Sequence, residues 1–209
     1  MKRLLTLTIL LLIGWNTAAQ DEDNPSPQLS KDPLTAEQAA IYRTLLSQYV
    51  QGDLNAALNI ADRTDPAGLN DDPSGVDISC SPGLKLEPIP RPRVIHRLTR
   101  DIALGPNMVL VDPRRQGELV KQNDPQNLMH RAIDDHQPVS DQQLDNSVKQ
   151  AFASGLFTFT EIVFDKSHRH AILAYSFWCG SLCGHGNTVV MKKSGGKWRV
   201  QKECGGWIS

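Results

Sequence analysis

The sequence lacks an excess of charge of either sign and lacks the motifs of several well-known enzyme classes. It contains 22 lysine and arginine residues against 23 aspartate and glutamate residues, a formal net charge of −1. Nucleic acids and anionic membrane surfaces attract strongly basic proteins, so neither is expected as a partner. No G-x-S-x-G, no H-E-x-x-H and no phosphate-binding loop occurs, so the chemistry that those motifs mark has no signature here.

A long apolar run is also missing outside the N-terminus. Residues 4–13 (LLTLTILLLI) form a short apolar stretch, about half of what a membrane-spanning helix needs. A basic pair precedes it and the small residues 17–19 (TAA) follow it, which is the order of a secretory signal peptide. We expect residues 1–19 to be cleaved before Gln20, with an uncleaved anchor as the alternative. The mature protein is then exported, periplasmic or secreted, and has no membrane span.

The remaining chain is long enough for one domain. Residues 20–32 (QDEDNPSPQLSKD) are acidic and nearly devoid of large apolar side chains, so a disordered tether is predicted. A single domain is expected over residues 33–209. Its main irregular segment is a Pro/Gly/Asp-rich loop at residues 64–92, and a loop of this length is usually functional, disordered or held by a cross-link.

Helical periodicity appears at the start of this domain. Thr35 and Gln38 form a capping-box pattern, and Gly52 is expected to end the helix that follows. The apolar residues on one face of this helix are Ile41, Tyr42, Leu45, Leu46 and Tyr49. Further along, a strand is slightly favoured over a helix within 54–63, a strand is predicted at 108–111, and helices are predicted at 125–133 and 140–155.

From Leu156 onward the apolar pattern changes to a period of two, which predicts strands at 157–164, 171–178, 188–193 and 197–203. The second of these is apolar on both faces and should lie in the sheet interior. The expected fold class is α+β, with an N-terminal helix packed on a curved C-terminal antiparallel sheet of about four strands.

A tight hairpin is predicted at Gly195-Gly196, because glycine accepts the positive φ of such turns. The resulting register pairs Met191 with Val200 and would place Cys204 on the same buried face as Val200.

Four cysteines in an exported chain predict two disulfides and no cofactor. Cys179–Cys183 with Cys80–Cys204 is the first pairing, worth about 2 and nearly 5 kcal/mol by loop-closure entropy. Cys183–Cys204 with Cys80–Cys179 is the alternative. A second hypothesis is a metal site formed by Cys179, Cys183, His185 and Cys204, since three thiolates and one imidazole suit zinc. A redox-active Cys179/Cys183 pair is the third.

The histidines and tryptophans suggest further sites. His168 and His170 lie at a predicted turn, and His130 and His136 flank acidic residues in MHRAIDDHQ, so a histidine with a carboxylate could be a general base. No residue is singled out as catalytic. The tryptophans could line a carbohydrate or peptide groove, although Trp198 is expected in the core and Trp207 is expected to dock the C-terminus.

The C-terminal segment CGSLCGHGNTVVMKKSGGKWRV and the closing WIS resemble a group of exported bacterial proteins. Their C-termini share a CG-x-LCG-x-G loop, a Gly-Lys-Trp hairpin and a final Trp-x-Ser. In that group a Tyr-x-x-x-Leu helix precedes a strand with an Asp/Thr pair, and Tyr42, Leu46, Asp62 and Thr64 look like those elements. The resemblance is good over 160–209 and weaker over 35–65. It implies an exported domain and transfers no activity.

These observations favour a non-catalytic binding module of the cell envelope, with a protein or another envelope component as its partner. An envelope hydrolase using a His/Asp pair and a Cys/His metal-binding protein are the alternatives. The surface expected to be active is the exposed rim of the cysteine loop around His185.

Overall fold

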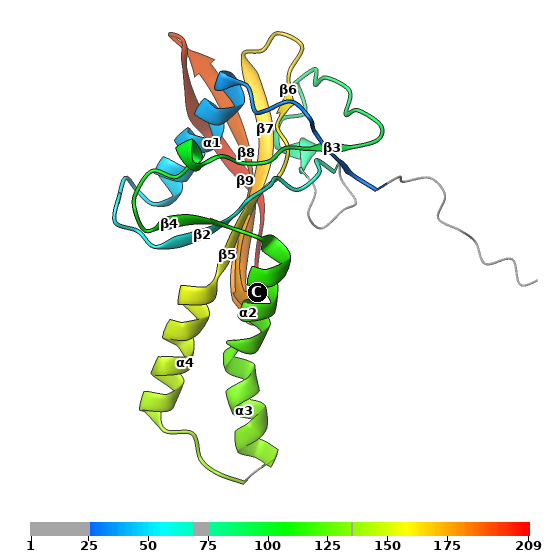
Figure 1. Cartoon of the computed structure of the whole chain (residues 1–209). Helices are drawn as coiled ribbons and strands as arrows, with labels where there is room; N and C mark the ends of the chain where they lie inside the picture. Colours follow the sequence, from blue (N-terminus) through cyan, green and yellow to red (C-terminus); the bar gives the residue numbers. More distant parts are fainter. Residues whose placement is uncertain (1–25, 69–75, 135) are drawn as a thin grey trace, which may run out of the picture.

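The computed structural model describes residues 26–68, 76–134 and 136–209 (Figure 1). The predicted signal peptide and the first part of the predicted tether lie outside these residues. Within the described ranges, no helix is long and apolar enough to cross a membrane.

Four α-helices form where capping signals and apolar spacing coincide. Their bounds are α1 Ala36–Tyr49, α2 Pro113–Gln122, α3 Pro125–Asp134 and α4 Asp141–Ser154. The capping boxes predicted before α1 and α4 are both present, each with a Gln side chain that accepts from the N-cap backbone. Helix α2 was missed, although Asp112 followed by a proline is a common N-cap and N1 pair.

The main sheet has seven strands and is mixed, so the predicted sheet of about four antiparallel strands was too small. Its order is β4-β2-β5-β7-β8-β9, with β6 paired to β7. The bounds are β2 Leu58–Ala61, β4 Met108–Val111, β5 Leu156–Phe159, β6 Val163–Phe164, β7 His170–Gly180, β8 Cys183–Ser194 and β9 Lys197–Ile208. Strands β2 and β4 add to β5 in parallel, whereas β5, β7, β8 and β9 run antiparallel.

Two short strands and two 3-10 helices of the described residues lie outside this sheet. Strand β1 (Gln28–Leu29) pairs in parallel with β3 (Val94–Ile95), so the end of the predicted tether is bonded to the domain rather than disordered. The two 3-10 helices are η1 Ile78–Cys80 and η2 Arg100–Ile102. The predicted strand 157–164 is divided into β5 and β6, because the Glu161 backbone N–H donates to the Asp65 carbonyl instead of to β7.

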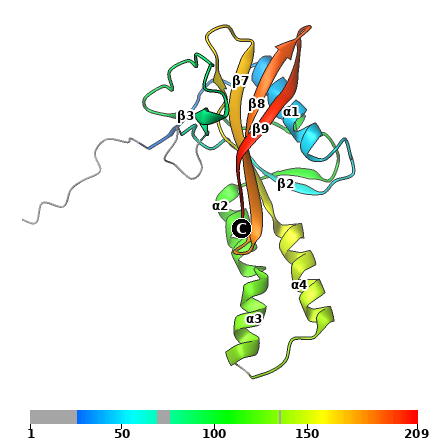
Figure 2. The ribbon, with the colours of Figure 1, turned by 180° about the vertical axis from the view of Figure 1, so that it is seen from behind.

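The two faces of the sheet carry different contacts. Helix α1 crosses one face, here called the helix face, and the two views in Figures 1 and 2 show it beside β8 and β9. Its buried residues pack with the apolar side chains of that face, which include Leu173, Tyr175, Phe177, Val189 and Met191. The opposite side, here called the loop face, carries Ile172, Ala174, Ser176, Thr188 and Val190.

A β-bulge transfers part of β9 from one face to the other. The predicted pair Met191–Val200 is present, but the next pair is Val190–Lys202, which leaves one extra residue on β9. Since side chains alternate along a strand, the residues from Lys202 to Cys204 change face, and a second bulge after Cys204 restores the alternation. Cys204 therefore lies on the loop face with Val190, and its predicted place beside Val200 was wrong.

Helices α3 and α4 form an arm that extends beyond the sheet in both views (Figures 1 and 2). Helix α3 buries no residue, and α4 buries only Ala151 and Ser154 near its C-terminal end. Because these helices bury little apolar surface, the core of the domain lies between α1 and the sheet.

Candidate functional site

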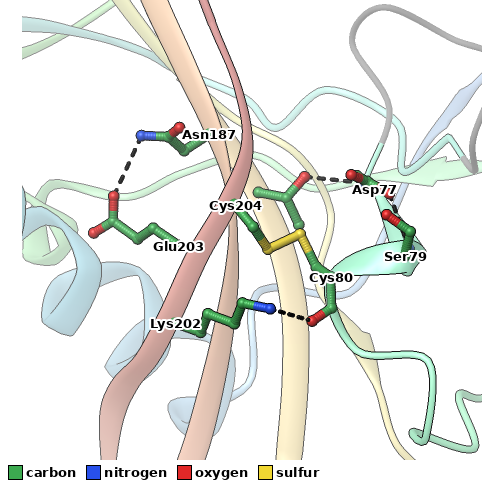
Figure 3. Close-up of a disulfide and its surroundings, with 8 residues drawn as sticks. Asp77, Ser79, Cys80, Asn187, Lys202, Glu203 and Cys204 are labelled. Carbon is green, nitrogen blue, oxygen red and sulfur yellow. Dashed lines mark hydrogen bonds between the residues drawn. A yellow bond between two sulfur atoms is a disulfide. The ribbon is translucent and has the colours of Figure 1, made fainter.

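The predicted pairing Cys179–Cys183 and Cys80–Cys204 is confirmed (Figure 3). The longer bond fixes the segment around η1 to the loop face. Two further contacts support this attachment: the Asp77 backbone N–H donates to Thr188 Oγ1 at 2.9 Å, and Lys202 Nζ donates to the Cys80 carbonyl at 3.2 Å.

These disulfides exclude the metal site that was predicted from Cys179, Cys183, His185 and Cys204. All four sulfurs are in disulfides, so Cys179, Cys183 and Cys204 offer no thiolate to an ion beside His185. The bulge also places Cys204 on the loop face, whereas Cys179 packs within the core of the helix face.

His185 lies in an aromatic cluster rather than on an exposed rim. Its ring stacks on Tyr49 with centroids 5.7 Å apart, and it also lies 5.9 Å from Phe177 and 6.3 Å from Tyr175. Burial, followed by the neighbouring Tyr175, raises the pKa of Tyr49 to about 12. The exposed residues of the cysteine loop are Ser181 and Leu182, and Leu182 is 74% accessible.

Three other histidines that the sequence suggested as candidate site residues, His136, His168 and His170, form contacts of their own. His168 pairs with Glu87 at 2.9 Å and stacks on Phe164. His170 Nδ1 lies 3.7 Å from Asp165, whose carboxylate accepts the backbone N–H groups of the same turn. His136 Nδ1 contacts a backbone carbonyl in the arm.

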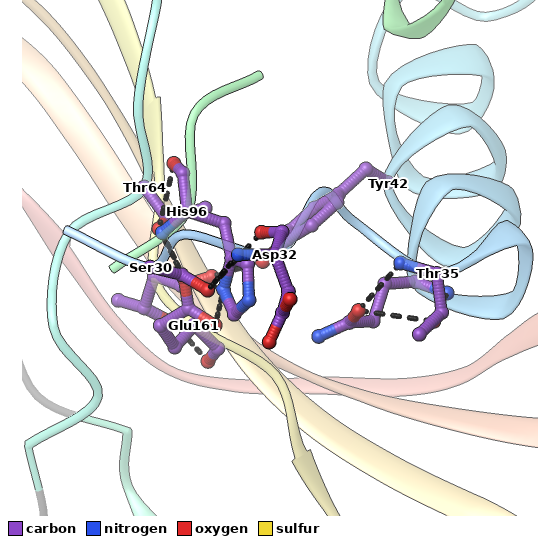
Figure 4. Close-up of polar contacts among 9 residues, drawn as sticks. Ser30, Asp32, Thr35, Tyr42, Thr64, His96 and Glu161 are labelled. Atoms are coloured by element: carbon purple, nitrogen blue, oxygen red, sulfur yellow. Dashed lines mark hydrogen bonds and ion pairs between the residues drawn. The ribbon is translucent and has the colours of Figure 1, made fainter. Parts of the chain in front are cut away.

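The structure instead assembles a polar centre around His96, which the sequence had not singled out (Figure 4). His96 Nδ1 lies 2.9 and 3.0 Å from the two carboxylate oxygens of Glu161, and its backbone N–H donates to Glu161 Oε1 at 2.8 Å. The Thr64 hydroxyl also donates to that oxygen. The His96 and Glu161 side chains are only 15% and 11% exposed, so the pair is held away from bulk water.

Two residues of the bacterial resemblance lie at this centre. Thr64 contacts both partners of the pair, and the Tyr42 hydroxyl donates to the Thr160 carbonyl at 2.9 Å, directly before Glu161. Burial raises the pKa of Tyr42, and the negative charge of Glu161 raises it further, so Tyr42 remains a neutral phenol.

A cavity of about 190 Å³ opens beside the His96–Glu161 pair. Pro88, Ile89 and Pro90 form part of its wall, and Arg93 also lines it. Within the described ranges, no group forms a hydrogen bond with His96 Nε2. If Nδ1 donates its proton to Glu161, Nε2 carries a lone pair that can accept a proton.

A second hollow, of about 140 Å³, lies on the loop face. Its lining includes the hydroxyl residues Thr158, Thr160, Ser176 and Thr188, together with Asp65, Asn187 and Trp207. The Thr158 and Ser176 hydroxyls are 3.0 Å apart across β5 and β7. This part of the loop face is therefore lined by polar side chains, whereas the neighbouring part buries an apolar cluster.

The Trp207 indole lies against two glycines beside this hollow. Gly184 and Gly186 alternate with His185, so both expose bare backbone on the loop face. A Cβ would lie 3.0 Å from the indole at the first and 2.6 Å at the second, so neither site accepts a side chain without moving Trp207. The indole remains 39% exposed, and its backbone pairs with Gly186, which confirms that it docks the C-terminus.

Trp207 reaches this face through a second bulge near Gly205, whose φ of 62° suits glycine. Trp178 packs near α2 on the loop face, and Trp198 is buried in the core as predicted. The alternating glycines could have been read from the sequence, whereas the His96–Glu161 contact joins residues 65 positions apart and leaves no local pattern.

The geometry therefore offers two candidate sites, the His96–Glu161 centre and the groove beside Trp207. Comparison of the chain with protein-family models, with curated proteins and with solved structures yields no match.

Proposed function

We propose that the protein is an exported module of the cell envelope that binds carbohydrate in the loop-face groove beside Trp207. The observation that carries this proposal is the indole itself. It lies against Gly184 and Gly186, belongs to a residue that is 39% exposed, and adjoins a hollow lined by hydroxyls.

Sugars match this combination of surfaces. A pyranose ring has an apolar C–H face that packs on a flat aromatic ring, and its hydroxyls both donate and accept hydrogen bonds. Thr158 and Ser176 offer hydroxyls, and Asp65 lies at the same hollow. A hollow of about 140 Å³ suits one sugar unit of a longer chain better than a large ligand.

Co-sedimentation with insoluble peptidoglycan, chitin and cellulose tests the proposal. We expect binding to at least one of them, and Trp207→Ala should weaken it by about tenfold or more, since an aromatic platform contributes on the order of 1–2 kcal/mol. Ile208→Ala is the matched control, because Ile208 is the next residue, is 90% exposed and faces the other way. Equal binding by Trp207→Ala and the wild-type protein, or no binding to any of the three, contradicts the proposal.

Hydrolysis is the second candidate function, and it is favoured by His96 Nε2, which accepts no hydrogen bond from the residues that the structure describes. In this reaction Nε2 takes a proton from water, and the resulting hydroxide attacks an ester carbonyl in the cavity. The leaving alcohol then recovers the proton from Nε2. Glu161 is a positioning residue, since its carboxylate holds Nδ1 and stabilises the imidazolium.

Hydrolysis of p-nitrophenyl acetate over a range of pH tests this second function. His96→Gln can keep the contact with Glu161 but cannot accept a proton, so we expect at least about a hundredfold loss in kcat. Glu161→Gln should displace the pH profile of any remaining activity. His130→Gln in the arm is the control, and equal rates for it and His96→Gln exclude His96 as the base.

A further inference from the structure

The arm formed by α3 and α4 exposes large apolar side chains to solvent. One of them, Phe152, also stacks on the core residue Phe177, with the ring centroids 6.2 Å apart. Met129 and Ile133 on α3 are 46% and 69% exposed, and Leu144, Val148 and Phe152 on α4 are 40%, 38% and 58% exposed. Each set recurs every four residues, so each forms one stripe along its helix.

The antiparallel hairpin brings these stripes to one side of the arm. The less exposed positions are Leu128 and Ala132 on α3 and Ser147 and Ala151 on α4. One residue further along a helix lies about 100° further around it. Each exposed apolar residue except Leu144 follows one of the less exposed positions in this way, and Leu144 lies one turn before Val148 on the same stripe. Since the two helices run in opposite directions, equal rotations carry both stripes to the same side of the hairpin, here called the arm face.

The charge of the arm argues against a lipid surface as the occupant of this face. Helices α3 and α4 carry two cations, Arg131 and Lys149, against three carboxylates, Asp134, Asp141 and Asp145. Helices that bind anionic membranes have lysine and arginine along the polar border of the apolar stripe.

The pattern on α4 is instead complementary to itself. When two copies of α4 pack antiparallel about a two-fold axis near Val148, Leu144 of each copy meets Phe152 of the other, and the two Val148 side chains meet at the centre. The same arrangement places Asp145 of each copy opposite Lys149 of the other. In the single chain, all five of these α4 side chains are exposed: Leu144, Asp145, Val148, Lys149 and Phe152.

We propose that the arm face pairs with the arm face of a second copy of this chain, forming an antiparallel four-helix bundle. Met129 and Ile133 widen the apolar seam on one side of the α4 pair, where α3 of one copy faces α3 of the other. In this arrangement the tip of each arm lies at the base of the other, so the two main sheets stand at opposite ends of the bundle.

Helix dimensions set the strength of this contact. A 14-residue helix is about 21 Å long, and two packed helices are about 20 Å wide, so each copy contributes roughly 400 Å². The total is about half of a standard protein interface, so the dimer should form at micromolar or higher concentrations.

Sedimentation equilibrium of the mature, disulfide-bonded protein from about 1 µM to about 1 mM tests the proposal. The weight-average mass should rise with concentration toward that of two copies. Val148→Asp places two carboxylates at the axis and should weaken association by about a hundredfold or more. A wild-type mass that stays at one copy over the whole range overturns the proposal.

A charge exchange separates self-pairing from other uses of the arm face. Asp145→Lys and Lys149→Asp should each weaken association by about fivefold to tenfold, because each places like charges in contact. The double variant Asp145→Lys/Lys149→Asp should return to the wild-type affinity, and the two single variants mixed together should associate more tightly than either alone.

The two-fold register proposed for α4 is overturned if the double variant does not recover the wild-type affinity, or if the mixed single variants associate no more tightly than either alone. Phosphatidylglycerol vesicles provide the opposing test: a monomeric wild-type protein that sediments with them and loses this binding in Val148→Asp overturns the proposal in favour of a lipid surface. Circular dichroism spectra that match the wild type confirm that each variant folds, since all three substituted residues are exposed.

Discussion

The helix face and the loop face of one sheet are stabilised in different ways. On the helix face, α1 and the sheet bury a continuous set of apolar and aromatic side chains, including Tyr42, Phe157 and Phe159 at 0% exposure. On the loop face, the apolar cluster is smaller, a disulfide fixes an irregular segment, and hydroxyls line an open hollow.

One face of the sheet therefore supplies most of the stability of the fold, whereas the proposed binding site lies on the other face. A close-packed face resists change, because each removed methylene leaves a cavity. A face covered by a cross-linked loop needs less apolar surface, so polar residues and an exposed indole can be placed there. The loop face is accordingly where the carbohydrate proposal lies.

The largest expected effect is on the helix face. Phe157→Ala should lower the free energy of unfolding by about 3–5 kcal/mol, because Phe157 is fully buried and contacts the rings of Tyr49, Phe159 and Tyr175. Urea denaturation followed by fluorescence measures the change. A loss below about 1 kcal/mol contradicts the view that this face dominates stability.

Removing the long disulfide should have the next largest effect. Cys80→Ser/Cys204→Ser should cost about 2–4 kcal/mol, since this bond links residues 124 positions apart. Cys179→Ser/Cys183→Ser is the matched control, and its separation of four residues should make the loss about 2 kcal/mol or less. Equal losses in the two variants contradict an origin in loop closure.

A methyl group at Gly186 tests the platform for Trp207. Gly186→Ala should destabilise the protein by about 1–3 kcal/mol, because the new Cβ meets the indole at 2.6 Å and the Tyr175 carbonyl at 2.7 Å. Gly83→Ala is the control, since no neighbour lies within 4 Å of its Cβ. Tryptophan fluorescence should shift in the first variant and not in the second.

The smallest effect concerns the turn before β7. Burial favours a protonated Asp165, but hydrogen bonds from Ser167 and from the backbone N–H groups of His170 and Arg169 prevail and lower its pKa to about 2. A lowered folded pKa stabilises the protein above the usual pKa near 4, and this contribution is lost as the pH falls toward 2.

Asp165→Asn should therefore destabilise the protein by about 1–2 kcal/mol at pH 6 and by much less near pH 2. Urea denaturation at the two pH values measures the difference. A destabilisation that does not depend on pH contradicts the role assigned to the ionised carboxylate.

The two faces also differ in how far sequence could predict them. The apolar spacing of α1, its capping box and the Gly195-Gly196 hairpin are local signals, and all three are confirmed. The bulges in β9 were not predicted, because one added residue gives no signal in the apolar pattern, yet it reverses the side chains that follow until the second bulge. This single shift moved Cys204 to the other face.

The candidate sites show the same limit. The alternation of Gly184, His185 and Gly186 is visible in the sequence. That the two glycines lie under the Trp207 indole is shown only by the tertiary structure. The His96–Glu161 centre joins segments that are distant in the chain, so only tertiary structure reveals it. The parallel strands β2 and β4 were likewise assigned to no sheet, since β2 joins the sheet through β5, which follows β4 only after a long helical connection.

The Cys80–Cys204 bond also has a consequence for biosynthesis. If the chain is exported as proposed, its cysteines reach the oxidising compartment in sequence order, and Cys80 meets Cys179 before Cys204 emerges. The Cys80–Cys204 bond skips two cysteines, so under the proposed export it forms only after Cys204 has crossed, directly or by exchange from an earlier bond. We expect the yield of exported protein to depend on a disulfide isomerase, which alkylation trapping of export intermediates can measure.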